Sequence, residues 1–196
     1  MNLRSHILIG CFLLFAFLNT AAQTLDSLPL VNVDSSIIHL GDFRDRPAVV
    51  LIFTGNHCVY SKKYEERIIE IAKKYQEKGI AFLFVNSNSP ALSTDDRLEL
   101  MRNRAIEKKY PCPYVQDRNG ALARGLGASK NPEAILGKWD EGEFLTLYSG
   151  KIDDNPLMAN RVENHYLIDA IKKLLAGDHS PSQSVEPIGC GIKMQE

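Results

Sequence analysis

The residue best placed for chemistry in this chain is Cys58, within the segment TGNHCVYS at positions 54–61. Before it, residues 48–53 (AVVLIF) are apolar and largely β-branched, which predicts a buried strand. After it, residues 62–79 repeat apolar side chains at helical spacing, and Gly79 is suited to end that helix. Cys58 is therefore expected where a strand passes into a helix. Free N–H groups and the positive end of the helix dipole stabilise a thiolate there.

The alternative to a reactive Cys58 is an inert one. A single cysteine is more often a small buried apolar residue than a nucleophile. The expected position at a helix start reverses that preference, so the sequence favours a reactive thiol. Lys62 stands one turn further along and could add positive potential, although a lysine there is more often solvated.

The first 22 residues have the pattern of a secretory signal peptide. Arg4 precedes an almost unbroken apolar run at 7–18, and the small residues at 20–22 offer a cleavage site before Gln23. The run is too short for a typical membrane span. Two alternatives stay open: residues 8–11 (LIGC) resemble a lipoprotein signal ending at Cys11, or the segment stays uncleaved as an anchor. Each alternative predicts an exported protein.

Three cysteines remain after cleavage, namely Cys58, Cys112 and Cys190, and an exported chain meets an oxidising compartment. An odd count leaves one thiol that is reactive or pairs with another molecule. Cys112 stands between two prolines, where burial is favoured over chemistry. Cys190 lies in the C-terminal tail, residues 178–196, which we expect to be extended and loosely held. It could reach Cys58 as a resolving thiol or stay free.

The composition is that of an ordinary globular protein. The chain has 196 residues, 44% of them apolar and 24% charged, and a formal net charge of −1. Nothing in this balance points to nucleic acid or an anionic membrane as a partner. The five histidines show no metal-ligand spacing, so we expect no metal and no other cofactor. Asp153 and Asp154 could form a carboxylate pair, but a turn explains them equally well.

The remaining pattern predicts an α/β domain with a mixed sheet flanked by helices. Residues 28–33 and 36–40 could form a hairpin, 81–86 a second buried strand, and 114–116 a short strand. Residues 94–96 (TDD) supply capping residues for a helix to about Lys109, and 121–126 suit a short helix. Residues 133–139 and 144–148 predict a hairpin, and 161–176 a final helix. Cys58 then lies at the end of a central strand, where such sheets place their sites.

This order of elements resembles the thioredoxin-like superfamily, and within it the AhpC/TSA, or redoxin and peroxiredoxin-like, proteins. The likeness extends from about Leu28 to the C-terminus. It is carried by the segments NHC at 56–58 with Tyr60, YEER at 64–67, FVNSN at 84–88, PY at 113–114 with Asp117, NP at 131–132, GKIDD at 150–154 and IGCGIK at 188–193. The resemblance implies a thioredoxin-like domain at 23–177 and an exported, periplasmic thiol redox protein whose active thiol is Cys58.

Several positions depart from the pattern of this superfamily. Ser61 stands where its thiol reductases have the second cysteine of Cys-x-x-Cys, so it can only support Cys58, for instance by a hydrogen bond to the sulfur. Gly55 stands where typical peroxiredoxins have threonine, and Thr54 lies one residue earlier. Pro132 resembles the cis-proline that faces the active cysteine, with Asn131 before it where threonine is common. An ordinary trans proline is the alternative.

The sequence as a whole predicts a thiol-based oxidoreductase. The Cys58 thiolate would attack a disulfide or a hydroperoxide, and Cys190 or an external thiol would resolve the product. The partners are then protein thiols and disulfides or small hydroperoxides, with an external thiol reductant. The competing hypothesis is a non-catalytic thioredoxin-fold module that binds exported proteins through the Pro132 surface. The sequence leaves peroxide reduction, disulfide exchange and the oligomeric state open.

Overall fold

The computed structural model describes residues 24–195. The predicted signal peptide at 1–22 and the alternative lipid site at Cys11 lie outside the described residues. Within 24–195, none of the helices has both the length and the apolar character needed to cross a bilayer.

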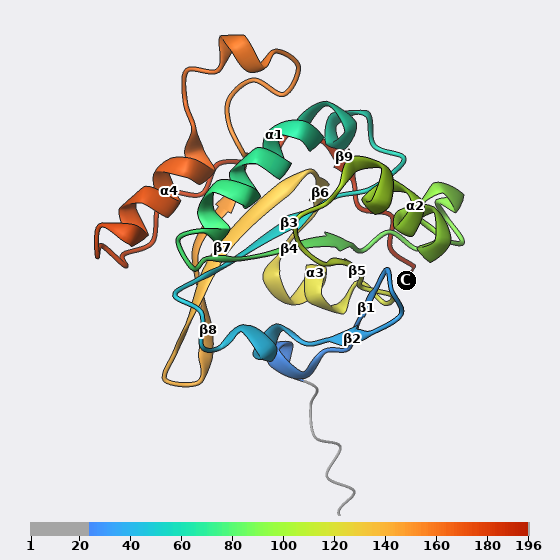
Figure 1. Ribbon diagram of the computed structural model, residues 1–196, viewed down its shortest axis with the longest axis horizontal. Coiled ribbons are helices and arrows are strands. Elements are labelled where there is room, and N and C mark those ends of the chain that lie inside the picture. Colours follow the sequence, from blue (N-terminus) through green and yellow to red (C-terminus); the bar gives the residue numbers. More distant parts are fainter. Residues whose placement is uncertain (1–23, 196) are drawn as a thin grey trace, which may run out of the picture.

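A seven-stranded sheet in the order β2-β1-β5-β4-β3-β7-β8 forms the centre of the domain (Figure 1). Its strands are β1 Leu30–Asn32, β2 Ile37–Ile38, β3 Val49–Phe53, β4 Ala81–Asn86, β5 Tyr114–Gln116, β7 Glu133–Asp140 and β8 Glu143–Gly150. The pair β3 and β4 and the pair β4 and β5 are parallel, whereas β7 runs antiparallel to β3 and pairs with β8 as a hairpin. The predicted α/β class with a mixed, helix-flanked sheet is confirmed.

Helices cover both faces of this sheet (Figure 1). They are α1 Val59–Gln76, α2 Leu98–Lys108, α3 Ala121–Leu126 and α4 Tyr166–Leu175, with short 3-10 turns η1 Leu25–Ser27, η2 Leu40–Phe43, η3 Thr94–Asp96 and η4 Ala159–Arg161. Alternate residues of β3 enter opposite cores, because successive strand side chains point to opposite faces. Val50 and Ile52 pack with α1 and α4, whereas Leu51 packs with α3.

Three helix starts differ from the sequence prediction. The first helix begins at Val59 rather than at 62, so Cys58 itself is the residue that caps it. The TDD segment at 94–96 does not cap α2 but forms the separate turn η3, and α2 starts after Arg97. The final helix begins at Tyr166 rather than at 161. Helix propensity and apolar periodicity predict where helices lie, but the predicted first and last residues can be wrong by several positions.

The C-terminal tail differs from the expected loosely held segment, because it is bonded to the domain at several points. Cys190–Gly191 forms strand β9, which pairs antiparallel with β6, Lys130–Asn131. Val185 forms a bridge with Gly150, and the Ile192 amide donates to Ser129 O over 3.0 Å. The side chains of Ile192 and Met194 pack against the core on the α3 side of the sheet. The tail is extended, as expected, but its last part lies against the domain.

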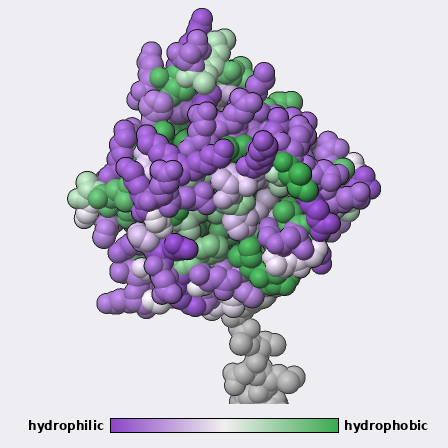
Figure 2. Space-filling model, viewed as in Figure 1, coloured by the Kyte–Doolittle hydropathy of each residue, from purple (hydrophilic) through white to green (hydrophobic). Residues whose placement is uncertain are grey.

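The outer surface is mostly hydrophilic in the face drawn in Figure 2, with separate apolar patches rather than one continuous apolar face. Two of the exposed large apolar residues stand beside the cysteines in the sequence: Val59 and Ile188. Val59 directly follows Cys58, and Ile188 precedes Cys190 by two residues.

Candidate functional site

Cys58 lies at the point where β3 ends and α1 begins. It is the N-cap residue of α1, with extended backbone angles, and it is completely buried. Its amide donates to Gly55 O over 3.2 Å, and its own carbonyl accepts the first helical hydrogen bond, from the Lys62 amide. The first-turn N–H groups of an α-helix have no helical partners, and they favour negative charge on a neighbouring sulfur. The expected strand–turn–cysteine–helix arrangement is present.

Cys58 is joined to Cys190 by a disulfide. The two Cα atoms are 5.8 Å apart, within the range that a disulfide spans. Their separation of 132 residues is closed by the pairing of β6 with β9, which sets Cys190 opposite Asn131. The sequence left open whether Cys190 reaches Cys58 or remains a free thiol. In the structure Cys190 is bonded to Cys58.

The segment at Asn131 and Pro132 lies directly against this disulfide. The Asn131 carbonyl oxygen is 2.8 Å from Cys58 Sγ, and the bond between Asn131 and Pro132 is cis, as the resemblance implies. In the reduced protein, a protonated Cys58 can donate to that oxygen. The carbonyl therefore contacts one cysteine while the backbone of the same residue pairs with the other.

The tail is held at the site by backbone contacts on both sides of Cys190. Lys193 donates its amide to Asn88 Oδ1 over 2.9 Å, and its carbonyl accepts the Ser89 amide over 2.6 Å. Gly189 packs so closely on Asn131 that a Cβ at position 189 would lie 2.2 Å from the Asn131 carbonyl oxygen. At Gly191 a Cβ would meet nothing within 4 Å. A side chain is therefore excluded on one side of Cys190 and tolerated on the other.

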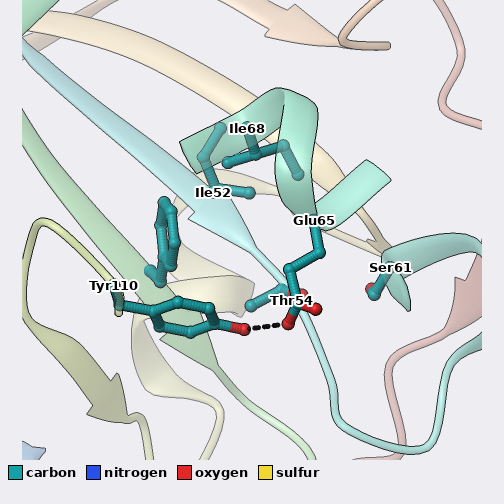
Figure 3. A pocket seen from close by; sticks show the side chains of 7 residues that line it. Ile52, Thr54, Ser61, Glu65, Ile68 and Tyr110 are labelled. Carbon is teal, nitrogen blue, oxygen red and sulfur yellow. Dashed lines mark hydrogen bonds between the residues drawn. The ribbon is translucent and has the colours of Figure 1, made fainter. Parts of the chain in front are cut away.

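Ser61 does not bond the Cys58 sulfur among the hydrogen bonds of the described residues. Its hydroxyl oxygen accepts the Gly55 amide at 3.4 Å, so it stabilises the turn that precedes the cysteine. Together with Thr54 and Glu65 it also lines a cavity of about 10 Å³, drawn in Figure 3. That volume holds about one water molecule, too little for a substrate. The expected support of Cys58 by Ser61 is therefore indirect, through the backbone.

Glu65 in this cavity belongs to a buried charge cluster. Arg104 approaches it with two nitrogens, at 2.6 and 3.0 Å, and the Tyr110 hydroxyl donates to it over 2.6 Å (Figure 3). The cluster connects α1 with α2 beneath the site. Thr54 lines the same cavity as Glu65. Arg67, also on α1, forms a separate ion pair with the buried Asp153.

The sequence prediction missed one polar pair beside Cys58, formed by His57 and Asp96. His57 Nδ1 is 2.7 Å from Asp96 Oδ2, and Asp96 is completely buried. The signal that could have found it is a histidine next to the cysteine together with an acid in the loop after the neighbouring strand. From the sequence alone, Asp96 is interpreted as a helix-capping residue, because its partner His57 lies 39 positions away and no local pattern connects the two.

An amide chain continues from this pair to the tail. Asn86 donates to Asp96 Oδ1 over 2.8 Å, and Asn88 donates to Asn86 Oδ1 over 2.9 Å. Asn88 Oδ1 in turn accepts from the Asn131 amide group over 3.2 Å and from the Lys193 backbone. The hydrogen bonds that hold the tail are thus continuous with those around His57.

Cys112 and the two aspartates have structural surroundings. Cys112 packs beside the core of β4 and β5, and burial raises the pKa of its thiol, so it stays protonated at neutral pH. Asp153 accepts from Tyr64 over 2.8 Å and pairs with Arg67, which fastens α1 to the loop after β8. Asp154 accepts backbone N–H groups at Glu163 and Asn164. The two carboxylates do not act as a pair.

The sequence pattern of the Redoxin family matches residues 18–138, which is more than half of the chain and includes Cys58. The chain belongs to the Redoxin family. Two solved structures resemble this Redoxin protein over most of its length. A hypothetical protein from Sinorhizobium meliloti is 27% identical, with a TM-score of 0.75, over 85% of this chain and 90% of that one. An uncharacterized conserved protein from Geobacillus kaustophilus is 29% identical, with a TM-score of 0.76, over 89% and 94%.

More distant structures share the fold. The bacterioferritin comigratory protein of Xanthomonas campestris, whose description concerns alkyl peroxide reduction, has a TM-score of 0.53 at 15% identity over 78% of this chain and 90% of that one. No curated protein matches the chain. The recognition of a thioredoxin-like, peroxiredoxin-like protein from its motifs is confirmed.

Proposed function

We propose that this Redoxin protein is a thiol–disulfide oxidoreductase that cycles between a Cys58–Cys190 disulfide and the dithiol. The observation that carries the proposal is the position of the tail, which brings Cys190 to Cys58 although Ser61 has replaced the usual neighbouring cysteine. The tail thus supplies the second thiol that the Cys-x-x-Ser segment lacks.

The cycle begins with the reduced protein. The Cys58 thiolate attacks one sulfur of a substrate disulfide, the substrate disulfide breaks, and one substrate thiolate leaves. The Cys190 thiolate then attacks Cys58 Sγ in the mixed disulfide and releases the second substrate thiolate. The substrate has gained two electrons, and the protein holds the Cys58–Cys190 disulfide of the structure.

Regeneration needs an external thiol, and burial decides where it attacks. Cys58 is completely buried in the disulfide form, whereas Cys190 is half-buried on an exposed strand. An incoming thiolate therefore meets Cys190, and Cys58 leaves as a thiolate at the helix N-terminus, where negative charge is stabilised. A second external thiolate then frees Cys190.

Hydroperoxide reduction is the second candidate, because a sulfenic acid on Cys58 would be resolved by Cys190 to the same disulfide. The peroxide reduction described for the Xanthomonas campestris protein favours it. Against it, Gly55 offers no hydroxyl, Thr54 lines a cavity with Glu65, and Arg67 and Arg104 are paired with buried acids. We therefore place disulfide exchange first.

The test compares two oxidants on the reduced protein. Oxidised glutathione and hydrogen peroxide are each added in slight excess, and the fraction of Cys58–Cys190 disulfide is followed by quenching with acid and mass spectrometry. The proposal predicts that the disulfide substrate forms the bridge faster. A faster reaction with peroxide makes the protein a peroxidase, and no bridge with either oxidant favours the binding module that lacks catalysis.

We further propose that the protein acts after export, in the periplasm of a bacterium, which is the compartment that the resemblance implies. The support is the signal pattern of residues 1–22 and the use of a disulfide, which persists in oxidising compartments. N-terminal sequencing of the protein from fractionated cells tests this. A mature chain starting at Gln23 supports cleavage, and recovery of Met1 in the cytoplasmic fraction contradicts export.

A further inference from the structure

Asn88 lies on the loop after β4, and its polar side chain is completely buried. Its Nδ2 group donates to Asn86 Oδ1 over 2.9 Å. Its Oδ1 atom accepts the Lys193 backbone N–H over 2.9 Å and the Asn131 side-chain amide over 3.2 Å. One buried oxygen therefore contacts both the C-terminal tail and the β6 segment that lies against Cys58.

Backbone N–H groups fix the orientation of this amide, because they can only donate. The Asn88 backbone N–H is 3.0 Å from Asn86 Oδ1, so Asn86 presents an oxygen and the Asn88 group that faces it is the NH₂. The Lys193 N–H faces the other end of the Asn88 amide, which must then be the oxygen. A flipped Asn88 would set two acceptors together at one end and two donors at the other. Its oxygen is therefore held toward the tail.

Gly55 leaves the space that the Asn88 amide occupies. A Cβ at position 55 would lie 2.6 Å from Asn88 Nδ2, which is closer than non-bonded heavy atoms pack. Gly55 stands where typical peroxiredoxins have threonine. Any side chain there would displace the Asn88 amide from its observed position, so the glycine before Cys58 and the buried Asn88 fit together.

The tail carries Cys190 between two anchors. Before Cys190, the Val185 carbonyl accepts the Lys151 amide over 3.1 Å. After Cys190, Lys193 is bonded to Asn88. The first anchor alone leaves Cys190 on a tether of five residues, which reaches roughly 17 Å, whereas the second holds it within three residues, or roughly 10 Å. The contact with Asn88 therefore restricts where the Cys190 sulfur can lie.

The tail must leave its observed position and return to it during the proposed cycle. Cys58 is completely buried while it is bonded to Cys190. In a mixed disulfide, the substrate sulfur takes the bonding position on Cys58 that the Cys190 sulfur has in the structure. The rate of the resolving step then depends on how often the tail returns and on where its contacts place Cys190.

We propose that Asn88 is the positioning residue of the resolving step, an inference that rests on the proposed thiol–disulfide cycle. Its oxygen binds the Lys193 N–H of the returning tail and holds Asn131, whose carbonyl contacts Cys58 Sγ at 2.8 Å. The Cys190 thiolate attacks Cys58 Sγ, the bond from Cys58 to the substrate sulfur breaks, and the substrate leaves as a thiolate. Asn88 takes no part in this exchange of bonds. It sets the fraction of mixed disulfide in which Cys190 lies within reach.

The experiment separates the two steps of the cycle with oxidised glutathione as the substrate. Full-length reduced protein is mixed with rising concentrations of it, quenched with acid at set times and alkylated. Mass spectrometry then distinguishes the reduced, glutathione-linked and bridged forms. The rate of the first step rises with the glutathione concentration, whereas bridge formation levels off at the rate of the resolving step.

Four proteins form a double-mutant cycle on the contact between Asn88 and the tail. Lys193→Pro removes the backbone N–H. Lys193→Ala is its reference, because it removes the same exposed side chain and keeps the N–H. Each of the two is made with Asn88 and with Asn88→Ala. Thermal unfolding of the reduced proteins checks that each one is folded.

With Asn88 present, Lys193→Pro is expected to slow the resolving step roughly fivefold relative to Lys193→Ala, as the loss of about one hydrogen bond implies, and to change the first step by less than about twofold. In the Asn88→Ala background, proline and alanine should differ by less than about twofold in the resolving step. Equal slowing by proline in both backgrounds overturns the proposal, because the N–H then acts without Asn88. Equal slowing of both steps overturns it too, because it indicates a general change of structure.

The comparison at position 193 is decisive even if Asn88→Ala does not fold. Equal resolving rates for Lys193→Pro and Lys193→Ala with Asn88 present overturn the proposal. The proposed function fails separately. If the wild-type protein forms no Cys58–Cys190 bridge with oxidised glutathione, the cycle is wrong and Asn88 has no resolving step to position. If the bridge forms at a rate that does not depend on the Lys193 N–H, the cycle stands and the assignment of Asn88 is wrong.

Discussion

Replacing Gly189 by alanine tests how far the tail strand controls the disulfide. A Cβ at position 189 would lie 2.2 Å from the Asn131 carbonyl oxygen and 2.6 Å from its carbonyl carbon. Non-bonded heavy atoms pack at roughly 3.5 Å, so the strand must withdraw by roughly 1 Å. The obstacle is backbone, so it cannot rotate away as a side chain could. β9 pairs with β6 at only two positions, and this shift weakens both.

The size of the effect follows from those two pairs. A backbone hydrogen bond contributes about 1 kcal/mol net, so loss of two costs about 2 kcal/mol. At 1.4 kcal/mol per factor of ten, the equilibrium constant for closing the Cys58–Cys190 disulfide falls roughly 30-fold. Gly191→Ala is the matched control, because its Cβ meets nothing within 4 Å. Both changes remove similar chain entropy from the unfolded state, so that contribution cancels in the comparison.

The assay is equilibration of each variant in mixtures of reduced and oxidised glutathione, followed by acid quenching and alkylation. The fraction of linked Cys58 and Cys190 is read by mass spectrometry. Gly189→Ala is expected to need a glutathione mixture that is roughly 30-fold more oxidising to form the same fraction of disulfide. For Gly191→Ala, the required mixture is expected to match that of the wild type within about twofold. Equal behaviour of the two variants refutes the argument that the β6–β9 contact positions Cys190.

Three further changes test other parts of the site. Cys58→Ser is expected to abolish thiol-dependent activity and leave the melting temperature of the reduced protein nearly unchanged; full activity in the variant contradicts the cycle. Ser61→Cys restores Cys-x-x-Cys and is expected to raise insulin reduction, whereas equal turnover means that Cys190 already resolves Cys58 fully. Because burial raises the pKa of Cys112, its thiol should alkylate far more slowly in the native protein at about pH 8 than in urea, and equal rates would contradict its burial.

Local sequence patterns predicted what depends on neighbours along the chain. The apolar run of β3 and the helical spacing after it placed Cys58 at the start of α1, because both signals are read within about ten residues of it. The hairpin of β7 and β8 followed in the same way, from two strand-like segments and the glycine-containing turn between them. The identity of Pro132 as a cis-proline came from resemblance rather than from any local pattern.

Local sequence patterns could not predict contacts between segments that lie far apart in the chain. Asp96 has the sequence context of a helix cap, and only the packing of η3 against the turn at 55–58 turns it toward His57. The tail was expected to be loosely held, because it is a terminal segment rich in serine and proline. Its attachment depends on pairing with the backbone of β6 and on the Asn88 side-chain amide, and the sequence alone does not bring either of them next to Cys190.

The most direct test of the cycle is peptide mapping of the wild-type protein after one turnover. The reduced protein is mixed with an equimolar disulfide substrate, quenched with acid, alkylated and digested without reductant. The account predicts one linked pair of peptides, containing Cys58 and Cys190 from the same chain, with Cys112 recovered as the free alkylated thiol. Recovery of Cys190 as a free alkylated thiol, with Cys58 oxidised to a sulfinic acid or bound to the substrate, would contradict it.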